Sequence, residues 1–571
     1  MNQMTNNRTK HYMTREITDL KDMLKQSVAL YGKNPAFLQK TEKGGDYKEI
    51  NYLKFLNDVN SLGTKLLDMG LKDQKIAIIG PNCYHFVLAY YAIVCGVGVA
   101  VPLDKELSST EINNLIKQSD CKAIFYTDDF IDDIDFSLVD HKFEMKQYPD
   151  NTCAMDWLIK EGKKLINMND TTYVTAKIDP EKMHMLLFTS GTTGNAKGVM
   201  LNHKNITSNI MDICKIVKVY PEDRSLSLLP IHHTFESTIG IATLLYAGGS
   251  VAFYEGLKYV AKNFKEAKAT ILIAVPLIVE SMYNKILREA VKTKRIKVLN
   301  FGISLNKTLT TMGLDLKKQI FKSVYKQFGG KLRLVVSGAA AIDPKVVRGF
   351  EDLGIRMLQG YGLTECSPLI SGTPDFENTY KKAGSVGPVV QSGEIKVIDK
   401  DADGIGEIIY RGPNVMMGYY KDEEETAKVL KDGWFYTGDL AFTDDKGWIY
   451  ITGRKKNVIV TKTGKNIYPE EIESYFLNSK YINEILVYGA TDEDTPDADT
   501  IVAAQIKPDM DVINEEFGND FSDENLYEFI KKTVAAMNME LPNYKRVRNM
   551  MIRKDEFEKT TTKKIKRHQN I

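Results

Sequence analysis

Residues 184–203 read HMLLFTSGTTGNAKGVMLNH, an apolar run followed by a turn of glycines and hydroxyl-bearing residues. Residues 185–188 have the composition of a buried strand. Glycines let the backbone approach a ligand closely, and hydroxyls, N–H groups and Lys197 can then bind an anion. The stretch predicts a phosphate-binding loop rather than a polar surface loop. It differs from the common P-loop, because Gly198 instead of Ser or Thr follows Lys197.

The segment TSGTTGNAKGV resembles the phosphate loop of the adenylate-forming, or AMP-binding, enzymes, which include acyl-CoA synthetases, luciferases and peptide-synthetase adenylation domains. Ala196 stands where that family usually has proline. The resemblance implies that Lys197 binds the phosphates of ATP. It implies the same for the residues that form the loop, Thr189, Ser190, Gly191, Thr192, Thr193 and Gly194.

The composition excludes several other classes of protein. A net charge of +1 gives no bulk attraction to nucleic acid. The six cysteines form no CxxC pair, so neither a disulfide framework nor a zinc site is predicted. The polar N-terminus lacks the apolar core of a signal peptide, and residues 86–101 are too short for a membrane span. We expect a cytoplasmic protein in which residues 86–101 form a buried helix, a turn and a buried strand.

Strands and helices are predicted to alternate along the chain, which is typical of α/β layering. Helices are expected at 51–69 and 203–217, and the N-terminus of the second should face the phosphate loop. Strands are expected at 75–80, 123–127, 225–230, 250–254, 270–275 and 332–337. Short strands separated by glycines after residue 383 predict a small β-rich subdomain, and residues 484–538 predict a compact α+β domain.

The resemblance implies a specific organisation of domains. It predicts an α/β fold with a large N-terminal region of two α/β subdomains plus a small β-barrel-like subdomain, and a small mobile α+β lid. We assign residues 1–453 to the N-terminal AMP-binding and acyl-binding region, 454–456 to a hinge and 457–571 to the lid.

Two histidines lie in the segment PIHHTFE, residues 230–236. His232 and His233 could bind a metal ion, but adjacent side chains rarely share one ion and no third ligand is near in the sequence. The resemblance instead implies that His233, with Phe235 following it, lines the acyl pocket.

The connection at 276–330 is long and contains two amphipathic stretches with basic faces. Its default interpretation is a solvated helix surface, although such a face can also lie on a membrane interface. The connection resembles that of long-chain fatty acyl-CoA synthetases, the bacterial ones most closely, rather than aryl or acetyl synthetases.

Two further motifs could bind a nucleotide. The small residues of SGAAA (337–341) would let a flat ring approach, and QGYGLTE (359–365) combines an aromatic ring, a hydroxyl and a carboxylate. The resemblance implies that Tyr361 stacks on adenine, Thr364 contacts the α-phosphate and Glu365 holds Mg²⁺. It adds to the nucleotide site the flanking small residues Gly338, Ala339, Ala340, Gly360 and Gly362.

The resemblance continues to the end of the chain. It implies that Asp439 and Arg454 bind the ribose, with Ile451 beside the nucleotide, and that Lys456 is the pivot of the hinge. Gly464 would lie against the pantetheine of CoA. The tail KTTTKKI (559–565) would be a disordered basic tail by composition, but the resemblance makes Lys564 catalytic. Lys563 is the alternative, because it replaces the glycine of the family.

The implied reaction joins a fatty acid to CoA at the expense of ATP, with Mg²⁺ as cofactor, and gives Thr364, Glu365, His233 and Lys564 catalytic roles. Three alternatives stay open: a fatty acyl-AMP ligase that serves a carrier protein, a medium-chain or aryl acid CoA ligase, and a non-catalytic membrane scaffold. A homodimer and peripheral contact with the inner face of the membrane also stay open, whereas nucleic acid is not expected as a partner.

Overall fold

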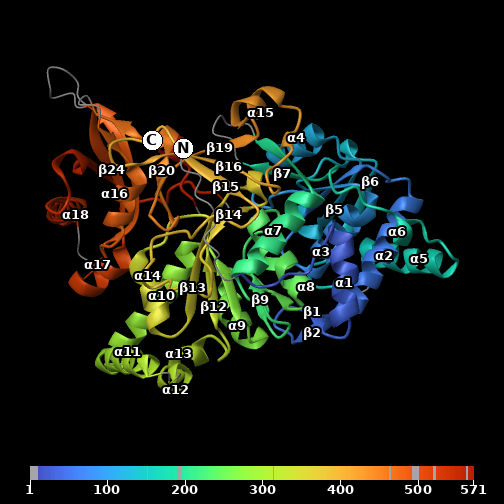
Figure 1. Ribbon diagram of the computed structural model, residues 1–571, viewed down its shortest axis with the longest axis horizontal. Helices are drawn as coiled ribbons and strands as arrows, with labels where there is room; N and C mark the ends of the chain where they lie inside the picture. Colours follow the sequence, from blue (N-terminus) through green and yellow to red (C-terminus); the bar gives the residue numbers. More distant parts are fainter. Residues whose placement is uncertain are drawn as a thin grey trace. The chain divides into compact units, whose positions relative to one another are not determined.

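The computed structural model describes residues 11–150, 152–189, 196–312, 314, 316–461, 465–491, 500–518, 522–560 and 564–571. The chain divides into two compact units (Figure 1). Unit 1 comprises Met1–Ala339, Pro344–Glu394 and Arg411–Gly433, and unit 2 comprises Ala340–Asp343, Ile395–Tyr410 and Trp434–Ile571.

Unit 1 contains two large sheets. The first has the order β14-β13-β12-β11-β9-β10-β1-β2 and is parallel except for its two edge strands, β14 and β2. Its strands are β1 Pro35–Lys40, β2 Tyr47–Asn51, β9 Arg224–Ser227, β10 Ser250–Phe253, β11 Ile271–Ala274, β12 Leu334–Ser337, β13 Arg356–Gly362 and β14 Leu369–Gly372. The strands predicted at 225–230, 250–254, 270–275 and 332–337 are therefore confirmed, each a little shorter than expected.

The second sheet has the order β17-β8-β7-β4-β3-β5-β6. Its strands are β3 Lys75–Ile79, β4 Val99–Pro102, β5 Ala123–Thr127, β6 His141–Met145, β7 Met183–Thr189, β8 Lys197–Asn202 and β17 Gly418–Tyr419. Strands β3 to β7 run parallel, whereas β8 and β17 are antiparallel to their neighbours. The chain passes from β3 to β4 and then returns across β3 to β5. Because each parallel crossover is right-handed, this reversal of direction puts helices on both faces of the sheet.

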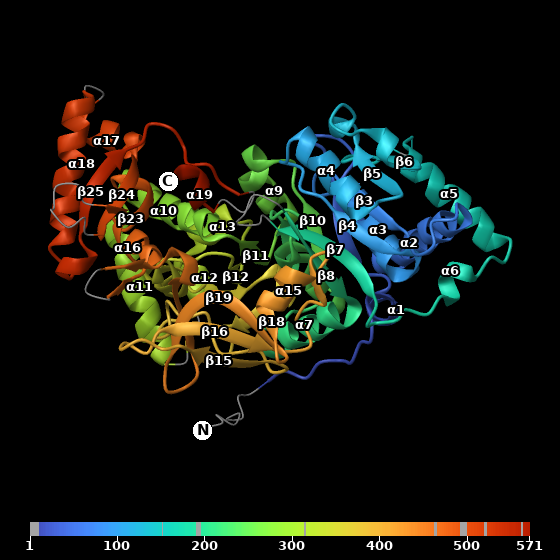
Figure 2. The ribbon, with the colours of Figure 1, turned by 90° about the horizontal axis from the view of Figure 1, so that it is seen from above.

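Helices cover these sheets as that rule requires. Figure 2 shows α4 (Ser109–Ser119) on the opposite side of β3 and β5 from α2 (Tyr52–Asp68) and α3 (Tyr84–Ala92). The apolar run 86–101 forms α3, a π-helical turn and β4, as predicted, and all four residues of β4 are buried. Within the described residues, no helix is long and apolar enough to cross a membrane.

The remaining helices of unit 1 are α1 Leu20–Tyr31, α5 Ala154–Asn167, α6 Thr172–Thr175, α7 His203–Ile216, α8 Thr243–Ala247, α9 Val260–Ala267, α10 Pro276–Lys292, α11 Ile296–Thr311, α12 Lys317–Ile320, α13 Lys322–Gln327, α14 Pro344–Asp352 and α15 Glu423–Val429. The predicted helices at 51–69 and 203–217 are thus confirmed in position.

One sequence prediction about α7 is wrong. Its N-terminus does not face the phosphate loop, because the loop is followed by a strand, β8, before the helix begins. In the β7/β8 hairpin, Thr189 pairs with Lys197 at the loop end and Met183 pairs with Asn202 at the other end. At about 3.4 Å per residue, the helix starts roughly 17 Å from the loop. The side chain of Asn202 caps α7 instead, by accepting a hydrogen bond from the N–H of Asn205.

Unit 2 contains an antiparallel sheet and an α+β domain. The antiparallel sheet includes β15 Glu394–Ile398, β16 Gly406–Arg411, β19 Trp434–Thr443 and β20 Ile449–Arg454, which matches the β-rich subdomain expected after residue 383. A short hairpin, β21 Ile459–Val460 with β22 Asn466–Ile467, follows.

The α+β domain has a three-stranded sheet of β23 Ile482–Thr491, β24 Thr500–Pro508 and β25 Val547–Ile552. Its helices are α16 Pro469–Phe476, α17 Met510–Phe517, α18 Asp523–Asn538 and α19 Arg567–Asn570. One apolar cluster fills this domain, and its fully buried members all lie between Ile459 and Val547. Strand β25, which sequence analysis did not predict, pairs in parallel with β24.

Candidate active site

The β7/β8 hairpin fixes the two ends of the predicted phosphate loop. Thr189 ends β7, Lys197 begins β8, and the two residues face each other in register. The loop residues between them lie outside the described residues, namely Ser190, Gly191, Thr192, Thr193 and Gly194. The described part of the motif therefore brings one lysine to the mouth of the loop.

Lys197 has two neighbours that sequence analysis did not find. Its Nζ lies 2.5 Å from a carboxylate oxygen of Glu425, the third residue of α15, and 5.1 Å from the ring centre of Tyr419. Glu425 is positioned because its N–H donates to the N-cap residue Asp422. The ammonium groups of Lys197 and then Lys428 lower the pKa of Glu425 to about 2, so this carboxylate is charged at neutral pH.

Tyr419 joins the phosphate-loop lysine to the second motif. Its hydroxyl donates a hydrogen bond to Glu365 Oε1 at 2.9 Å. Burial first, and then the charge of Glu365, raise the pKa of Tyr419 well above its usual value, so it remains a donor. The ring is held in place because β17 pairs with β8, with Tyr419 opposite Val199. Lys197 and Glu365 thus share one aromatic neighbour.

The QGYGLTE motif forms the end of β13 and a tight turn. Tyr361 lies opposite Ser371 of β14, and Thr364 and Glu365 lie in a 3-10 turn. A Cβ on Gly362 would come 1.8 Å from the carbonyl oxygen of Pro368, so only glycine fits there. The N–H of Met416 donates to the carbonyl of Glu365 at 2.8 Å and fixes the turn.

The small residues after β12 lie beside this turn. A Cβ on Gly338 would lie 3.3 Å from the carbonyl oxygen of Gly360 and 3.1 Å from the ring of Phe235, so these three residues adjoin. Ala339 has φ of +71°, the left-handed region that is uncommon for alanine and often marks a functional site. The predicted residue Ala340 is the first residue of unit 2.

The two histidines of the PIHHTFE segment lie side by side, with ring centres 4.1 Å apart. Burial lowers the pKa of His232 to about 3, so its ring is neutral. The N–H of His233 donates to the carbonyl of Pro230 and forms a turn just before Phe235. In the described part of the chain, the one group of three side chains close enough to share a metal ion is His85, Cys153 and Asp156, which includes neither of these histidines.

Unit 2 brings together the predicted ribose ligands. Asp439 and Arg454 face each other on β19 and β20, and Arg454 Nε lies 2.9 Å from Asp439 Oδ1. Asp439 is only 4% exposed, so this pair compensates a buried negative charge. Ile451 lies on the same strand, β20, opposite Ala441. The sequence motifs identified Asp439 and Arg454 as ribose ligands, but only the structure shows that the two side chains form an ion pair with each other.

Lys564 belongs to the same neighbourhood. The residue as a whole is exposed, whereas the protein atoms around its ammonium group partly desolvate that group. This desolvation, and then the positive charge of Arg454, lower its pKa to about 8, while Asp439 acts in the opposite direction. The position of Lys564 is fixed by its backbone, since Thr560 N–H donates to the carbonyl of Lys564 at 2.8 Å. Lys563 lies outside the described residues.

The predicted hinge is a 3-10 turn, Lys455–Asn457. Lys455 pairs with Glu407 at 2.7 Å, whereas burial first, and then the charges of Arg454 and Arg567, lower the pKa of Lys456. Gly464, the predicted pantetheine contact, lies outside the described residues.

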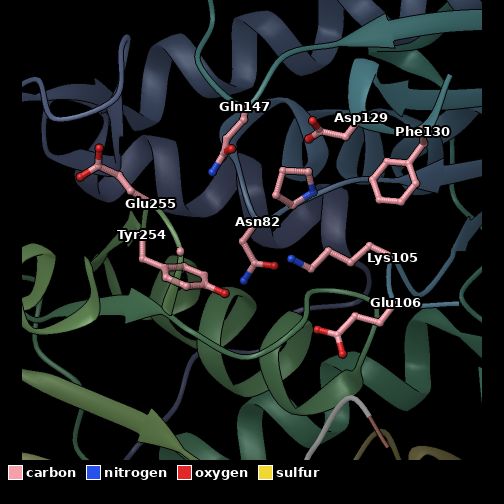
Figure 3. A pocket seen from close by; sticks show the side chains of 10 residues that line it. Asn82, Lys105, Glu106, Asp129, Phe130, Gln147, Tyr254 and Glu255 are labelled. Carbon is pink, nitrogen blue, oxygen red and sulfur yellow. The ribbon is translucent and has the colours of Figure 1, made fainter. Parts of the chain in front are cut away.

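A separate cavity of about 340 Å³ lies at the carboxyl ends of strands from both sheets of unit 1 (Figure 3). Figure 3 shows Lys105 extended toward Asn82 across it. Asn82 donates to Leu229 O and to Ser227 Oγ, and so anchors the segment that leads to His232. None of the predicted site residues lines this cavity, whose walls are Pro81, Asn82, Lys105, Glu106, Asp129, Phe130, Gln147, Tyr254, Glu255 and Gly256.

Comparison with known proteins places this geometry in context. Residues 24–420 match the family described as AMP-binding enzyme, and residues 456–571 match the AMP-binding enzyme C-terminal domain. Long-chain-fatty-acid–CoA ligase 5 of Rattus norvegicus is 31% identical over 477 residues, 78% of this chain and 69% of that protein. Fatty acyl-CoA synthetase A of Dictyostelium discoideum is 27% identical over 509 residues, 84% of this chain and 74% of that protein.

Two solved structures share the fold. The anthranilate CoA ligase AuaEII, in complex with anthranoyl-AMP, aligns with a TM-score of 0.75 and 18% identity over 99% of this chain and 97% of its own. A Mycobacterium tuberculosis fatty acyl CoA synthetase aligns with a TM-score of 0.63 and 21% identity over 96% of both chains. The predicted α/β fold with a C-terminal domain is confirmed.

Proposed function

The chain belongs to the AMP-binding enzyme family, and from this we propose that it activates a long-chain fatty acid with ATP and transfers it to CoA. The observation that carries the proposal is the contact of Tyr419 with both Lys197 and Glu365, which joins the phosphate-loop motif to the adenine motif. Relatives named as long-chain fatty acid–CoA ligases over more than two thirds of both chains support the substrate class.

The reaction has two halves. A carboxylate oxygen of the acid attacks the α-phosphorus of ATP, and the bond to pyrophosphate breaks, leaving acyl-adenylate. The thiol of CoA then loses its proton and attacks the acyl carbon, and AMP leaves. Phosphoryl-type transfer is accelerated chiefly by positioning and charge neutralisation, so no protein nucleophile is required. The six cysteines, all buried, have no assigned role.

Charged groups of the chain would supply that neutralisation. The phosphates of ATP would replace Glu425 as the partner of Lys197, together with the loop residues 189–194, and Thr364 would contact the α-phosphate. The carboxylate of Glu365 suits Mg²⁺, which takes oxygen ligands, because Tyr419 is a neutral donor that orients the carboxylate without cancelling its charge. Bound Mg²⁺ neutralises phosphate charge.

The nucleoside and acyl parts would bind to other predicted residues. Adenine would stack on Tyr361 between Gly360 and Gly362, close to Gly338, Ala339 and Ala340. The ribose diol would bind Asp439 and Arg454, near Ile451, because a carboxylate accepts and a guanidinium donates. His233, beside Phe235, would line the acyl pocket.

For the second half-reaction we propose that residues 457–571 turn as a lid against residues 1–453, with the hinge at 454–456 and the pivot at Lys456. Lys564 would contact the carboxylate and α-phosphate only before the turn. Gly464 would then lie against the pantetheine of CoA.

For its place in the cell we propose the cytoplasm, with contact at the inner face of the membrane, where long-chain acids partition because of their apolar tails. A homodimer is a further hypothesis, which sedimentation would test by the mass of the particle.

The experiment that tests the proposed function is pyrophosphate release across acids of increasing chain length, with and without CoA. We expect palmitate to exceed acetate and benzoate, and CoA to be needed for AMP release. If acyl-adenylate accumulated without release of AMP even when CoA is present, the carrier-protein ligase would be favoured. If shorter or aryl acids were turned over faster than palmitate, the substrate would be reassigned to those acids. If Glu365→Gln released pyrophosphate at the wild-type rate, another site would be responsible for the reaction. If no acid gave any pyrophosphate release, only the non-catalytic scaffold would remain as a function.

A further inference from the structure

The long connection between β11 and β12 has a large excess of positive over negative charge. Residues 277–326 contain eleven lysines and arginines against three acidic residues, a net charge of +8, although the whole chain carries only +1. The rest of the chain is therefore acidic by seven charges. This segment folds into α10, α11, α12 and α13, and Figure 1 shows α11 and α12 at the margin of unit 1.

The same helices expose large apolar side chains. Along α11, Val298 is 67% exposed, Phe301 is 68% exposed and Leu305 is 38% exposed, and Met312 just beyond the helix is 69% exposed. Their spacing of three, four and seven residues puts them on one face at about 100° per residue. Further exposed apolar side chains lie on α10 and in the connection to α12, namely Leu277, Val291, Leu314 and Leu316.

Basic side chains gather at the start of this apolar face, in the turn from α10 to α11. Lys292, Lys294, Arg295 and Lys297 are all exposed, and no acidic residue that the structure describes forms an ion pair with any of them. A solvated helix usually has its charges balanced and its apolar residues turned inward. Here both the apolar side chains and the uncompensated cations face water.

We propose that this surface, made by α10, α11, the turn at residues 293–295 and the residues Met312, Leu314 and Leu316, docks on a lipid bilayer with anionic headgroups. Apolar side chains at the interface would enter the acyl boundary, while lysines and arginines beside them would contact anionic headgroups. A second copy of the chain fits this face less well, because an isologous contact would bring the same exposed cations of two copies together. A nucleic acid would match the charge but not the stripe of Val298, Phe301 and Leu305.

The docking surface is connected to the proposed active site by packing. α11 contacts α14, and α14 packs against β13, the strand that carries Tyr361. If the proposed function holds, docking would bring unit 1 to the phase in which a long-chain acid is dissolved. The surface itself does not depend on that function, because lipid binding can be measured without ATP, acid or CoA.

The test is cosedimentation of the full chain with vesicles of phosphatidylcholine alone or of phosphatidylcholine mixed with phosphatidylglycerol. We expect binding to the mixed vesicles only, and its loss at high salt. Two variants address the two features: Val298→Asp with Phe301→Asp, and Lys292→Glu, Lys294→Glu, Arg295→Glu and Lys297→Glu together. At about 1 kcal/mol per cation near an anionic surface, the charge variant should weaken binding by about 10²-fold or more.

Matched controls separate docking from folding and from catalysis. Met168→Asp removes a residue that is 76% exposed outside this surface and should leave vesicle binding unchanged. Each variant should release pyrophosphate at the wild-type rate when the acid is dispersed in detergent, which shows that it is folded. If the wild-type chain bound vesicles but released no pyrophosphate, only the proposed function would be refuted. Equal binding to both vesicle types, unchanged binding of the surface variants, or a dimer that these variants abolish without any vesicle binding would overturn the proposal.

Discussion

The hydroxyl of Tyr419 donates a hydrogen bond to Glu365, from a residue that lies 54 positions later in the chain. The same ring lies 5.1 Å from the ammonium group of Lys197. Tyr419 is therefore the side chain through which the two nucleotide motifs of unit 1 are held in one arrangement, although neither motif includes it.

Removing this hydroxyl should weaken the response to Mg²⁺. A hydrogen bond to a charged group contributes about 1.5–3 kcal/mol, so Tyr419→Phe should raise the Mg²⁺ concentration for half-maximal adenylation by about 10-fold or more. ATP–pyrophosphate exchange in a Mg²⁺ titration measures the effect. The matched control is Tyr420→Phe, whose hydroxyl bonds Asp120 at the surface, and it should change nothing. Equal effects of the two variants would contradict the assignment of Tyr419.

Glu425 competes with ATP for Lys197 in this interpretation. A partly exposed ion pair is worth about 0–1 kcal/mol, so Glu425→Gln should lower the apparent Kd for ATP by up to about fivefold. Calorimetric titration with ATP measures this change. Glu424→Gln is the control, because Glu424 is exposed and pairs with Lys428 instead. A higher Kd in Glu425→Gln would mean that Glu425 holds Lys197 in its binding position.

Lys564 should matter for one half-reaction only. A charge-assisted bond to a developing oxyanion supports a loss of about 10²-fold in acyl-adenylate formation for Lys564→Ala. With preformed acyl-adenylate and CoA, the same variant should form thioester at nearly the wild-type rate. Lys563→Ala is the control for the alternative alignment and should be mild. If Lys563→Ala were the more harmful, or if Lys564→Ala harmed both steps equally, the tail would have to be reassigned.

The hinge variant should show the reverse pattern. Lys456→Pro fixes φ at the proposed pivot, so it should slow thioester formation and leave pyrophosphate release intact. Lys456→Ala keeps the backbone free and separates the role of the side chain from that of the rotation. Single-turnover assays of each half-reaction distinguish these variants, and a loss of pyrophosphate release in Lys456→Pro would argue against a pivot at this residue.

The pH dependence follows from the lowered pKa of Lys564, about 8 in the folded chain. Only the protonated lysine stabilises an oxyanion, so kcat/KM for adenylate formation should fall as pH rises through about 8. In the unfolded chain this lysine keeps its proton to higher pH. Below a pH of about 8 the group therefore lowers the free energy of unfolding, and this destabilisation is relieved as the pH rises from the folded towards the unfolded pKa. Lys564→Arg should remove the alkaline fall, and an unchanged profile would exclude Lys564 as its source.

The sequence predicted those parts of the site that consist of local motifs. Gly362 has to be glycine because of a backbone contact within the same turn, and Asp439 and Arg454 each occupy a motif position. The role of Tyr419 depends on a two-residue strand paired with β8, which no local pattern reveals. The misplaced N-terminus of α7 has a similar cause: residues 197–202 continue the motif, and only their pairing with β7 shows that they form a strand.

Strand β25 was missed for a different reason. Its residues 547–552 include Arg548 and Asn549, both exposed, so the apolar alternation of a strand is broken. The sequence also left open whether the end of the chain has fixed contacts. The described residues 564–571 have them with distant residues, since Arg567 pairs with Glu473 and Gln505 donates to the carbonyl of Asn570.

The apolar cluster of the α+β domain has a mechanical consequence. Its fully buried side chains come only from the segment between Ile459 and Val547, so the cluster stays intact when the backbone turns at a residue that precedes Ile459. Apolar area within this cluster would be neither gained nor lost in such a rotation, so burial inside the cluster gives no preference to either orientation. A ligand that binds one orientation more tightly than the other would shift the balance between them.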